Sequence, residues 1–207
     1  MNRMRLDGES IRDAMLASAD RLSPRRGGPG VRPPLPDELV STLLKGQWVT
    51  SPDEEDHRRR SIYIFVRRNL RYPLFDVFDR PDTNASCPQR ARSTTAPQSL
   101  TLFNSELSLA AARELAGFAW KQAGTESAAQ IEFCYARALG RRASAAELAA
   151  GKSFLRAQAE QLRRDGRDAN AIAAPSGLRS DEDRFAAAAL TDLCLAIINL
   201  NEFIYLD

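Results

Sequence analysis

Apolar residues recur at helical spacing through the second half of the chain. One set stands at positions i, i+3, i+4, i+7 and i+8 and consists of Ile131, Cys134, Tyr135, Ala138 and Leu139. Because this spacing places all five side chains on one face of an α-helix, it predicts an amphipathic helix that packs against other elements. Gly140 follows directly, and glycine is the residue type that most often ends a helix.

Three further segments of this half carry the same kind of pattern. A stripe of Leu107, Ala111, Leu115 and Phe118 predicts a helix over about 106–122. Ser144 with Glu147 forms a capping box for the next helix, whose inward residues are Leu148, Leu155, Ala159 and Leu162. The last helix, capped within 180–183, carries apolar residues on two faces from Phe185 to Leu200, which predicts burial between other helices.

Shorter elements are expected in the first half. Asp7 can cap a helix that runs to about Leu22, the acids after Pro36 open a short helix to about Leu44, and 97–104 forms another. Residues 25–36 read as a loop, 53–56 as a solvated acidic loop, and 73–82 as a loop or single turn. The segment 83–97 is predicted to be a long ordered loop.

Two short segments favour β structure. Ile62–Val66 is rich in β-branched and aromatic residues, which predicts a short strand, with a buried helical turn as the alternative. The ending 202–206 could be a second strand that pairs with it. Glycine and proline in 165–180 predict a flexible linker. The expected fold is a mainly α single domain over 1–207, with a long ordered loop and at most one short two-stranded β element.

Composition narrows the function classes. A net charge of +2 argues against nucleic acid as a partner. The chain has one histidine, His57, and three cysteines without a CxxC pair, so neither a multi-histidine zinc site nor a haem c attachment motif is expected, and we predict no cofactor. No run of about 18 apolar residues is present, which predicts no membrane span. The polar first ten residues do not form a signal peptide.

Arginine is concentrated between residues 58 and 71. Four of these residues are candidates for an anion-binding surface: Arg59, Arg60, Arg67 and Arg68. Guanidinium groups grip sulfate and carboxylate bidentately, so an anionic glycan is one possible ligand. The favoured alternative is internal pairing of the arginines, with Arg67 and Arg68 bound to acids in 76–82 and others to the acids in 53–56.

Oxygen donors and a cysteine follow this cluster. Asp79, Asp82 and Asn84, together with Asp76, could hold Ca²⁺ or supply a carboxylate pair for glycoside cleavage. Turn and capping chemistry is the favoured interpretation of the same residues. Cys87 lies near Arg90, a cation that would lower its thiol pKa and make it reactive. A structural role, or a disulfide to an upstream segment, is favoured over a catalytic thiol.

Several segments together resemble a known family. They are 5–16, 59–70, 78–88, 94–100 and 199–205, which include Arg-Leu-Asp-Gly-Glu-Ser-Ile-Arg-Asp-Ala-Met-Leu and Phe-Asp-Arg-Pro-Asp-Thr-Asn-Ala-Ser-Cys-Pro. These motifs resemble the C-terminal domain of unknown function of large planctomycete proteins that often carry an upstream cytochrome c domain. The resemblance spans nearly the whole chain, with the motifs in the same order. It implies that the chain is the C-terminal part of a larger family domain.

The resemblance also sets the functional expectation. It implies a periplasmic or extracellular protein whose partner is an upstream domain or subunit, on which haem c is possible. We expect a non-catalytic structural or interaction module that docks on that partner. The alternative is binding or hydrolysis of an anionic, sulfated polysaccharide through the Arg- and Asp-rich stretch 58–92. A chain without its partner is expected to self-associate through exposed apolar surface.

Overall fold

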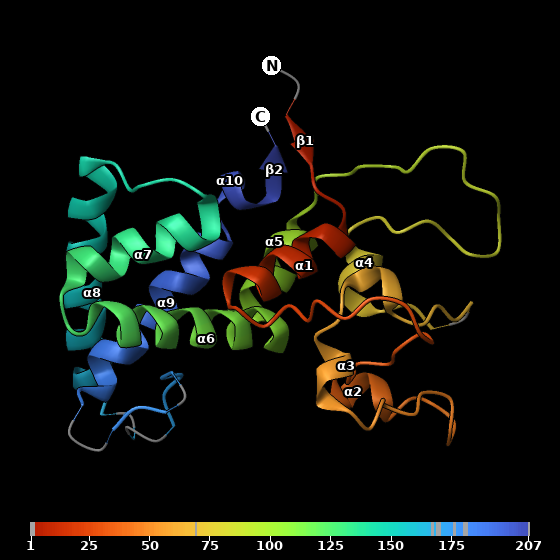
Figure 1. Cartoon of the computed structure of the whole chain (residues 1–207), viewed down its shortest axis with the longest axis horizontal. Coiled ribbons are helices and arrows are strands. Elements are labelled where there is room, and N and C mark those ends of the chain that lie inside the picture. The colour runs from red at the N-terminus through yellow and green to blue at the C-terminus, as the bar shows by residue number, and fades with distance from the viewer. Residues whose placement is uncertain are drawn as a thin grey trace.

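The computed structural model describes residues 3–68, 70–166, 168, 171–175, 177–179 and 182–206. The fold is mainly α, as predicted. Four long helices form a bundle on one side of the molecule, and shorter elements with long connections form the other side (Figure 1). The bundle consists of α6 (Glu106–Ala123), α7 (Ser127–Leu139), α8 (Ala145–Arg164) and α9 (Arg184–Ile198).

The bundle helices begin and end where local sequence signals predict. The capping box of Ser144 and Glu147 is formed at the start of α8. Gly140 follows α7 with φ of 70°, a left-handed conformation that glycine adopts without strain. The predicted limits of these helices are therefore confirmed to within a few residues.

Helix α9 lies at the centre of the bundle and packs mainly against α6 and α8. Its fully buried side chains include Ala187, Ala189, Leu190, Cys194 and Ile198. The prediction that this helix is buried between others is confirmed. Asp183 is its N-cap, while Ser180 and Asp181 of the predicted cap lie outside the described residues.

A second, smaller apolar cluster lies under the connection from α8 to α9. Ile172 and Ala174, within the segment predicted as a flexible linker, are buried against Leu162 and Ala188. The described part of this connection is therefore held by apolar contacts, because Ile172 and Ala174 pack between the end of α8 and the start of α9.

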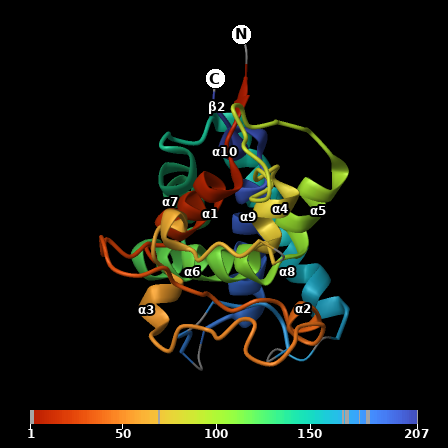
Figure 2. The same ribbon diagram turned by 90° about the vertical axis from the view of Figure 1, so that its right-hand side faces the viewer.

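The first half of the chain contains only one helix longer than nine residues among its described elements. The α-helices of this half are α1 (Gly8–Ser18), α2 (Asp37–Val40), α3 (Glu54–His57), α4 (Pro73–Val77) and α5 (Ala96–Asn104). Figure 2 shows α2 and α3 at the lower edge of the molecule, with α1, α4 and α5 above them. Helices α1 and α2 end earlier than predicted, and the acidic run expected to be a loop forms α3 instead.

The predicted strand over 62–66 is wrong. Ser61–Tyr63 forms a 3₁₀ turn. The chain just after this turn pairs with a single residue, Val31. The Val31 N donates to the Tyr63 carbonyl, and the Phe65 N donates to the Val31 carbonyl, each at 2.8 Å. Ile64 is buried, but its neighbours Ile62, Phe65 and Val66 are exposed. Ile64 is the only side chain of the run that is buried, so the run lacks the alternating buried face of a strand.

The terminal strand is partly confirmed, with a different partner. Residues Asn201–Ile204 form the short helix α10, and only β2 (Tyr205–Leu206) is extended. It pairs antiparallel with β1 (Met4–Arg5), which brings the two ends of the described chain together (Figure 1). The one short two-stranded element that was expected is therefore present. No helix in the described part is both long and apolar enough to cross a membrane.

Candidate functional site

Arg12 on α1 is buried and binds the segment that follows α3. Its Nη1 donates to the Arg59 carbonyl at 3.0 Å and to Ser61 Oγ at 3.2 Å, and its Nη2 donates to the His57 carbonyl. Neighbouring Asp13 accepts hydrogen bonds from the Ser61 N and Oγ at 2.7 and 2.6 Å. One turn of α1 thus fixes the chain over 57–61 through polar contacts.

Arg59, a predicted ligand-binding residue, is itself buried. Its Nη1 donates to the Pro29 carbonyl at 3.3 Å, its Nη2 donates to the Gly27 carbonyl, and its guanidinium lies 4.1 Å above the ring of Tyr63. Asp56 lies 3.8 Å away. Arg59 therefore holds the loop before α2 in place, and it presents no charge to an external anion.

Asp79 is bound on two sides. Arg5 Nη2 donates to it at 2.6 Å, and the Ser93 N and Oγ donate to it at 2.7 and 2.8 Å. Burial raises the pKa of this carboxyl, but the bonds from Ser93 and the charge of Arg5 outweigh burial, and the net pKa is lowered. Its φ of 60° is unusual for a residue other than glycine. These contacts assign Asp79 to the attachment of the loop after α4.

Arg90 anchors the far end of the same loop. It makes a bidentate pair with Glu9 at 3.0 and 3.2 Å and a further contact with Asp7 at 3.3 Å. Arg80 lies 3.6 Å from Glu9 on the other side. The acidic side chains in the first turn of α1 therefore hold the long loop through these arginines. Figure 1 shows the loop returning toward α1.

Asp82 and Asn84 form a turn. Asp82 Oδ1 accepts hydrogen bonds from the Asn84 N at 3.0 Å and Nδ2 at 2.9 Å, and Arg71 lies 3.3 Å from the same oxygen. Arg71 also binds Asp76 at 2.7 Å. The described residues contain no group of three or more histidine, cysteine, aspartate or glutamate side chains placed to hold a metal ion.

The predicted partners of Arg67 and Arg68 are wrong. Arg71 takes Asp76 and Asp82, and Arg5 takes Asp79, so these acids are already paired. Arg67 donates instead to the Gln47 carbonyl. Arg68 is exposed and makes no ion pair within the described chain. Sequence proximity misled here because Arg5, which binds Asp79, is 74 positions away.

The remaining candidates are at the surface. Arg60 is exposed and lies 3.5 Å from Asp13. Cys87 is exposed in the long loop, where its Sγ donates to the Gln89 carbonyl at 3.1 Å. Arg60 lies beside Asp13 of α1, whereas Cys87 lies in the loop after α4, and the structure does not join all nine predicted residues into one site.

A cleft of about 640 Å³ opens beside His57, between the loop before α2 and the start of α6. His57 Nε2 is 2.7 Å from the Ser51 carbonyl, which can only accept, so this nitrogen carries the proton. The cleft is lined by side chains of both charges, including Glu38, Arg58 and Glu106. The apolar part of the lining includes Leu16, Pro33, Pro36, Tyr72, Leu74 and Leu107. The prolines and the lone histidine were the only sequence signals for this cleft.

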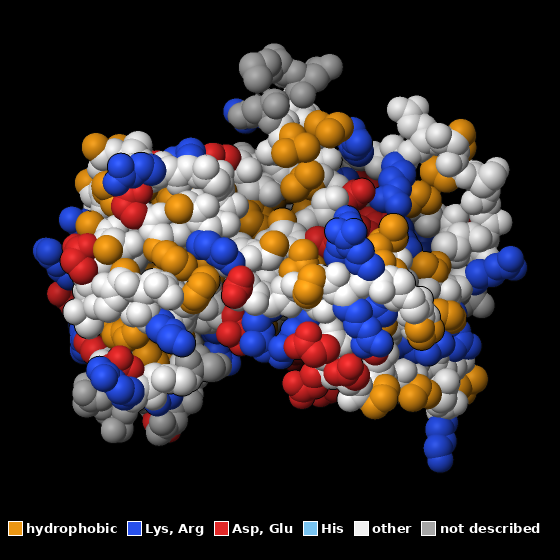
Figure 3. All heavy atoms as spheres, viewed as in Figure 1, with side chains coloured by type: hydrophobic (Ala, Val, Ile, Leu, Met, Phe, Trp, Pro, Cys, Tyr) orange, Lys and Arg blue, Asp and Glu red, His pale blue; other side chains and the backbone are white. Residues whose placement is uncertain are grey.

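Exposed hydrophobic side chains gather in the segment around α2 and α3. Six of them lie within residues 40–66, and we call them together the 40–66 surface: Val40, Leu44, Val49, Ile62, Phe65 and Val66. Val49 and Phe65 line one shallow hollow with Arg32 and Arg67, and the Arg32 guanidinium lies 4.1 Å above the Phe65 ring. Figure 3 shows hydrophobic side chains along the lower right edge of the molecule, where Figure 1 places this segment.

Comparison with known proteins identifies a family. A family model described as "PSD1: Protein of unknown function (DUF1553)" matches residues 1–155, three quarters of the chain. No curated protein matches the chain, and no solved structure does. The match confirms the resemblance to a domain family of unknown function. The chain therefore belongs to the PSD1 (DUF1553) family.

Proposed function

We propose that this chain is a non-catalytic interaction module whose 40–66 surface docks on an upstream domain of the same multidomain envelope or secreted protein. The observation that carries the proposal is the hollow lined by the exposed Val49 and Phe65, in a segment with four more exposed hydrophobic side chains. Soluble proteins rarely leave such side chains together unless another surface covers them.

The surroundings of the hollow favour a protein partner with an apolar centre and an acidic rim. Arg32 and Arg67 line the hollow, and Arg68 is exposed next to it in the chain. Aromatic and arginine side chains together are the composition that protein interfaces favour. Arg59 and Arg67, two of the candidates for binding an anionic glycan, donate to backbone carbonyls instead.

The test uses two phenylalanines of nearly equal exposure. Phe65 on the surface is 38% exposed and Phe154 on α8 is 37% exposed. The wild-type chain should bind a hydrophobic dye and self-associate in sedimentation at micromolar concentration, and co-expression with the domain encoded upstream should suppress both. Phe65→Ser should weaken complex formation, whereas Phe154→Ser should not. A monomer that ignores both the dye and the upstream domain would overturn the proposal.

The second candidate, binding of a sulfated polysaccharide, is favoured only by the exposed charges of Arg60 and Arg68. Dextran sulfate should then raise the melting temperature, since a ligand that prefers the folded state stabilises it. The double variant Arg60→Ala, Arg68→Ala should lose that increase, and Phe65→Ser should retain it. No increase with the wild-type chain would remove this candidate.

A further inference from the structure

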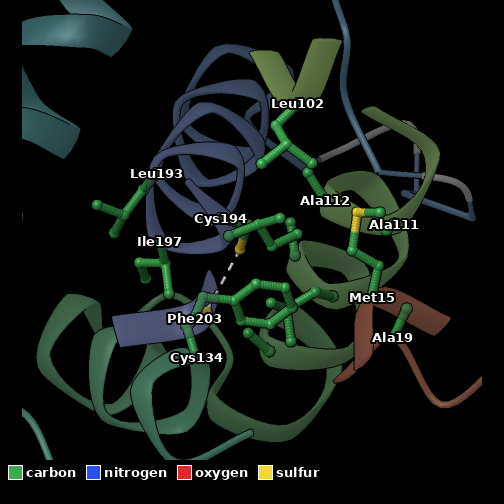
Figure 4. Close-up of a cluster of buried hydrophobic side chains, with 14 of the residues drawn as sticks. Met15, Ala19, Leu102, Ala111, Ala112, Cys134, Leu193, Cys194, Ile197 and Phe203 are labelled. Carbon is green, nitrogen blue, oxygen red and sulfur yellow. Dashed lines mark hydrogen bonds between the residues drawn. The ribbon is translucent and has the colours of Figure 1, made fainter. Parts of the chain in front are cut away.

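Cys134 and Cys194 face each other in the core of the bundle. Cys134 lies on α7 and Cys194 on α9, and their Sγ atoms are 3.4 Å apart (Figure 4). Both side chains are fully buried. The two residues are 60 positions apart in the sequence, so the packing of the two helices brings the sulfurs together.

We propose that Cys134 and Cys194 form a disulfide bond between α7 and α9 when the chain folds in the presence of a disulfide reagent. A thiolate of one cysteine attacks the reagent RSSR, forms a mixed disulfide and releases one RS⁻. The second cysteine then attacks the protein sulfur of that mixed disulfide, forms the Cys134–Cys194 bond and releases the other RS⁻. The cysteines lose two electrons to the reagent, and their two protons leave on the released thiols.

The surroundings of the two sulfurs favour this pairing. Ile131, Leu190 and Ile198 belong to the same buried cluster and offer no polar partner. No metal-binding group of side chains is present in the part of the chain that is described. A disulfide bond is 2.03–2.05 Å long, so a side-chain rotation with a small approach of α7 to α9 closes the remaining gap.

The bond should form during folding. The thiolate is the reactive form, and burial raises the pKa of Cys194 well above its usual value, as does its neighbour Cys134. Once the bundle has closed, neither sulfur is accessible to a reagent in solution. Cys87 is exposed in the long loop and has no cysteine beside it, so it remains the single thiol outside the pair.

The bond would join two parts of the chain that the family match separates. Cys134 lies within residues 1–155, and Cys194 lies beyond them. The cross-link would close a long loop, restrict the unfolded chain and raise the melting temperature by several degrees. It would thus fix the last helix to the family-matched part of the chain.

The test refolds the Cys87→Ser variant from denaturant, once with oxidised glutathione and once with a non-thiol reductant. Free thiols are counted by iodoacetamide labelling of the denatured protein, together with its mass. The oxidised sample should contain no free thiol, should be lighter by two hydrogen atoms, and should melt several degrees above the reduced sample. Two free thiols, glutathione adducts, or an unchanged melting temperature would overturn the proposal.

Two controls keep the result specific. The variant Cys87→Ser, Cys194→Ala should keep its remaining thiol free or bound to glutathione, with no gain in melting temperature. In the wild-type chain refolded the same way, a peptide map should show Cys134 linked to Cys194. A link from Cys87 to either buried cysteine would contradict the pairing.

Discussion

Apolar side chains make the contacts between α6 and α9, whereas buried guanidinium groups join the loops around α1. In the bundle, Leu115 and Leu190 are fully buried. In the first half of the chain, Arg5, Arg12 and Arg59 are almost as deeply buried. Both halves contribute apolar side chains to one core, but among the described residues only the first half also buries guanidinium groups.

The difference follows from the backbone that each half contains. A long helix satisfies its own carbonyls, so its buried face needs only apolar side chains. The carbonyls of Gly27, Pro29, His57 and Arg59 stand in loops or at the end of α3. Arg12 and Arg59 supply their donors. Each of the three buried arginines leaves its Nε without a partner, a further cost that these contacts must outweigh.

The largest effect is expected from Arg12→Ala. The change leaves the carbonyls of His57 and Arg59 without a donor and opens a cavity beside Asp13. We expect a loss of about 4 kcal/mol in the free energy of unfolding, measured by urea denaturation. Arg12→Met keeps most of the volume but none of the donors, and should recover only a small part of that loss. Full recovery by methionine would show that volume, not hydrogen bonding, holds this half.

In the bundle, Leu115→Ala should cost about 3 kcal/mol in the same measurement, because it removes apolar contacts and leaves a cavity. Leu115→Met, which conserves volume, should cost less than about 1.5 kcal/mol. The pair of methionine variants sharpens the comparison. Methionine should be tolerated in the bundle and not at Arg12, and equal tolerance would remove the distinction.

A smaller effect tests how closely α7 and α8 approach. A Cβ added at Gly151 would lie 2.9 Å from Ile131 Cδ1. Alanine would favour the helix, but this contact should make Gly151→Ala a net loss of about 1 kcal/mol. Ile131→Val removes the clashing carbon, so the double variant should be more stable than additivity predicts. Additive effects would show that the helices adjust without strain.

The smallest effect is a pH dependence at the end of the bundle. The hydrogen bonds from Arg141, then the Ser144 N, lower the pKa of Glu147 to about 2. A lowered pKa gives stability that is present above the unfolded pKa of about 4.3 and is lost as pH falls toward the folded value. Melting temperature should therefore fall less between about pH 6 and about pH 3 in Glu147→Gln than in the wild-type chain. An equal fall in both would contradict this role.

The same contrast explains what could be predicted from the sequence. The limits of α6 to α9 follow from apolar spacing, capping residues and Gly140, which are local signals. Arg12 gave no such signal, because its carbonyl partners are at least 45 positions away along the chain. Ile62–Val66 carried a strand-like composition, but only Ile64 of the run is buried.

The candidate site was predictable to a lesser degree. The sequence correctly singled out the stretch 58–92 as rich in paired charges. Several partners, however, come from α1 and β1, which sequence spacing does not place beside it. The 40–66 surface gave no periodic pattern, since it is built on loops and very short helices. Exposure of a side chain there depends on how the loops pack.

Amide hydrogen exchange on the Arg59→Met variant tests most directly whether guanidinium groups hold the first half of the chain. The amides of Val31, Phe65 and Ser23, which bond across the loops beside Arg59, should lose protection. Amides of α6 and α9 should exchange as in the wild-type chain, because apolar contacts hold those helices. Unchanged protection at the three loop amides, or an equal loss throughout α6 and α9, would contradict the account.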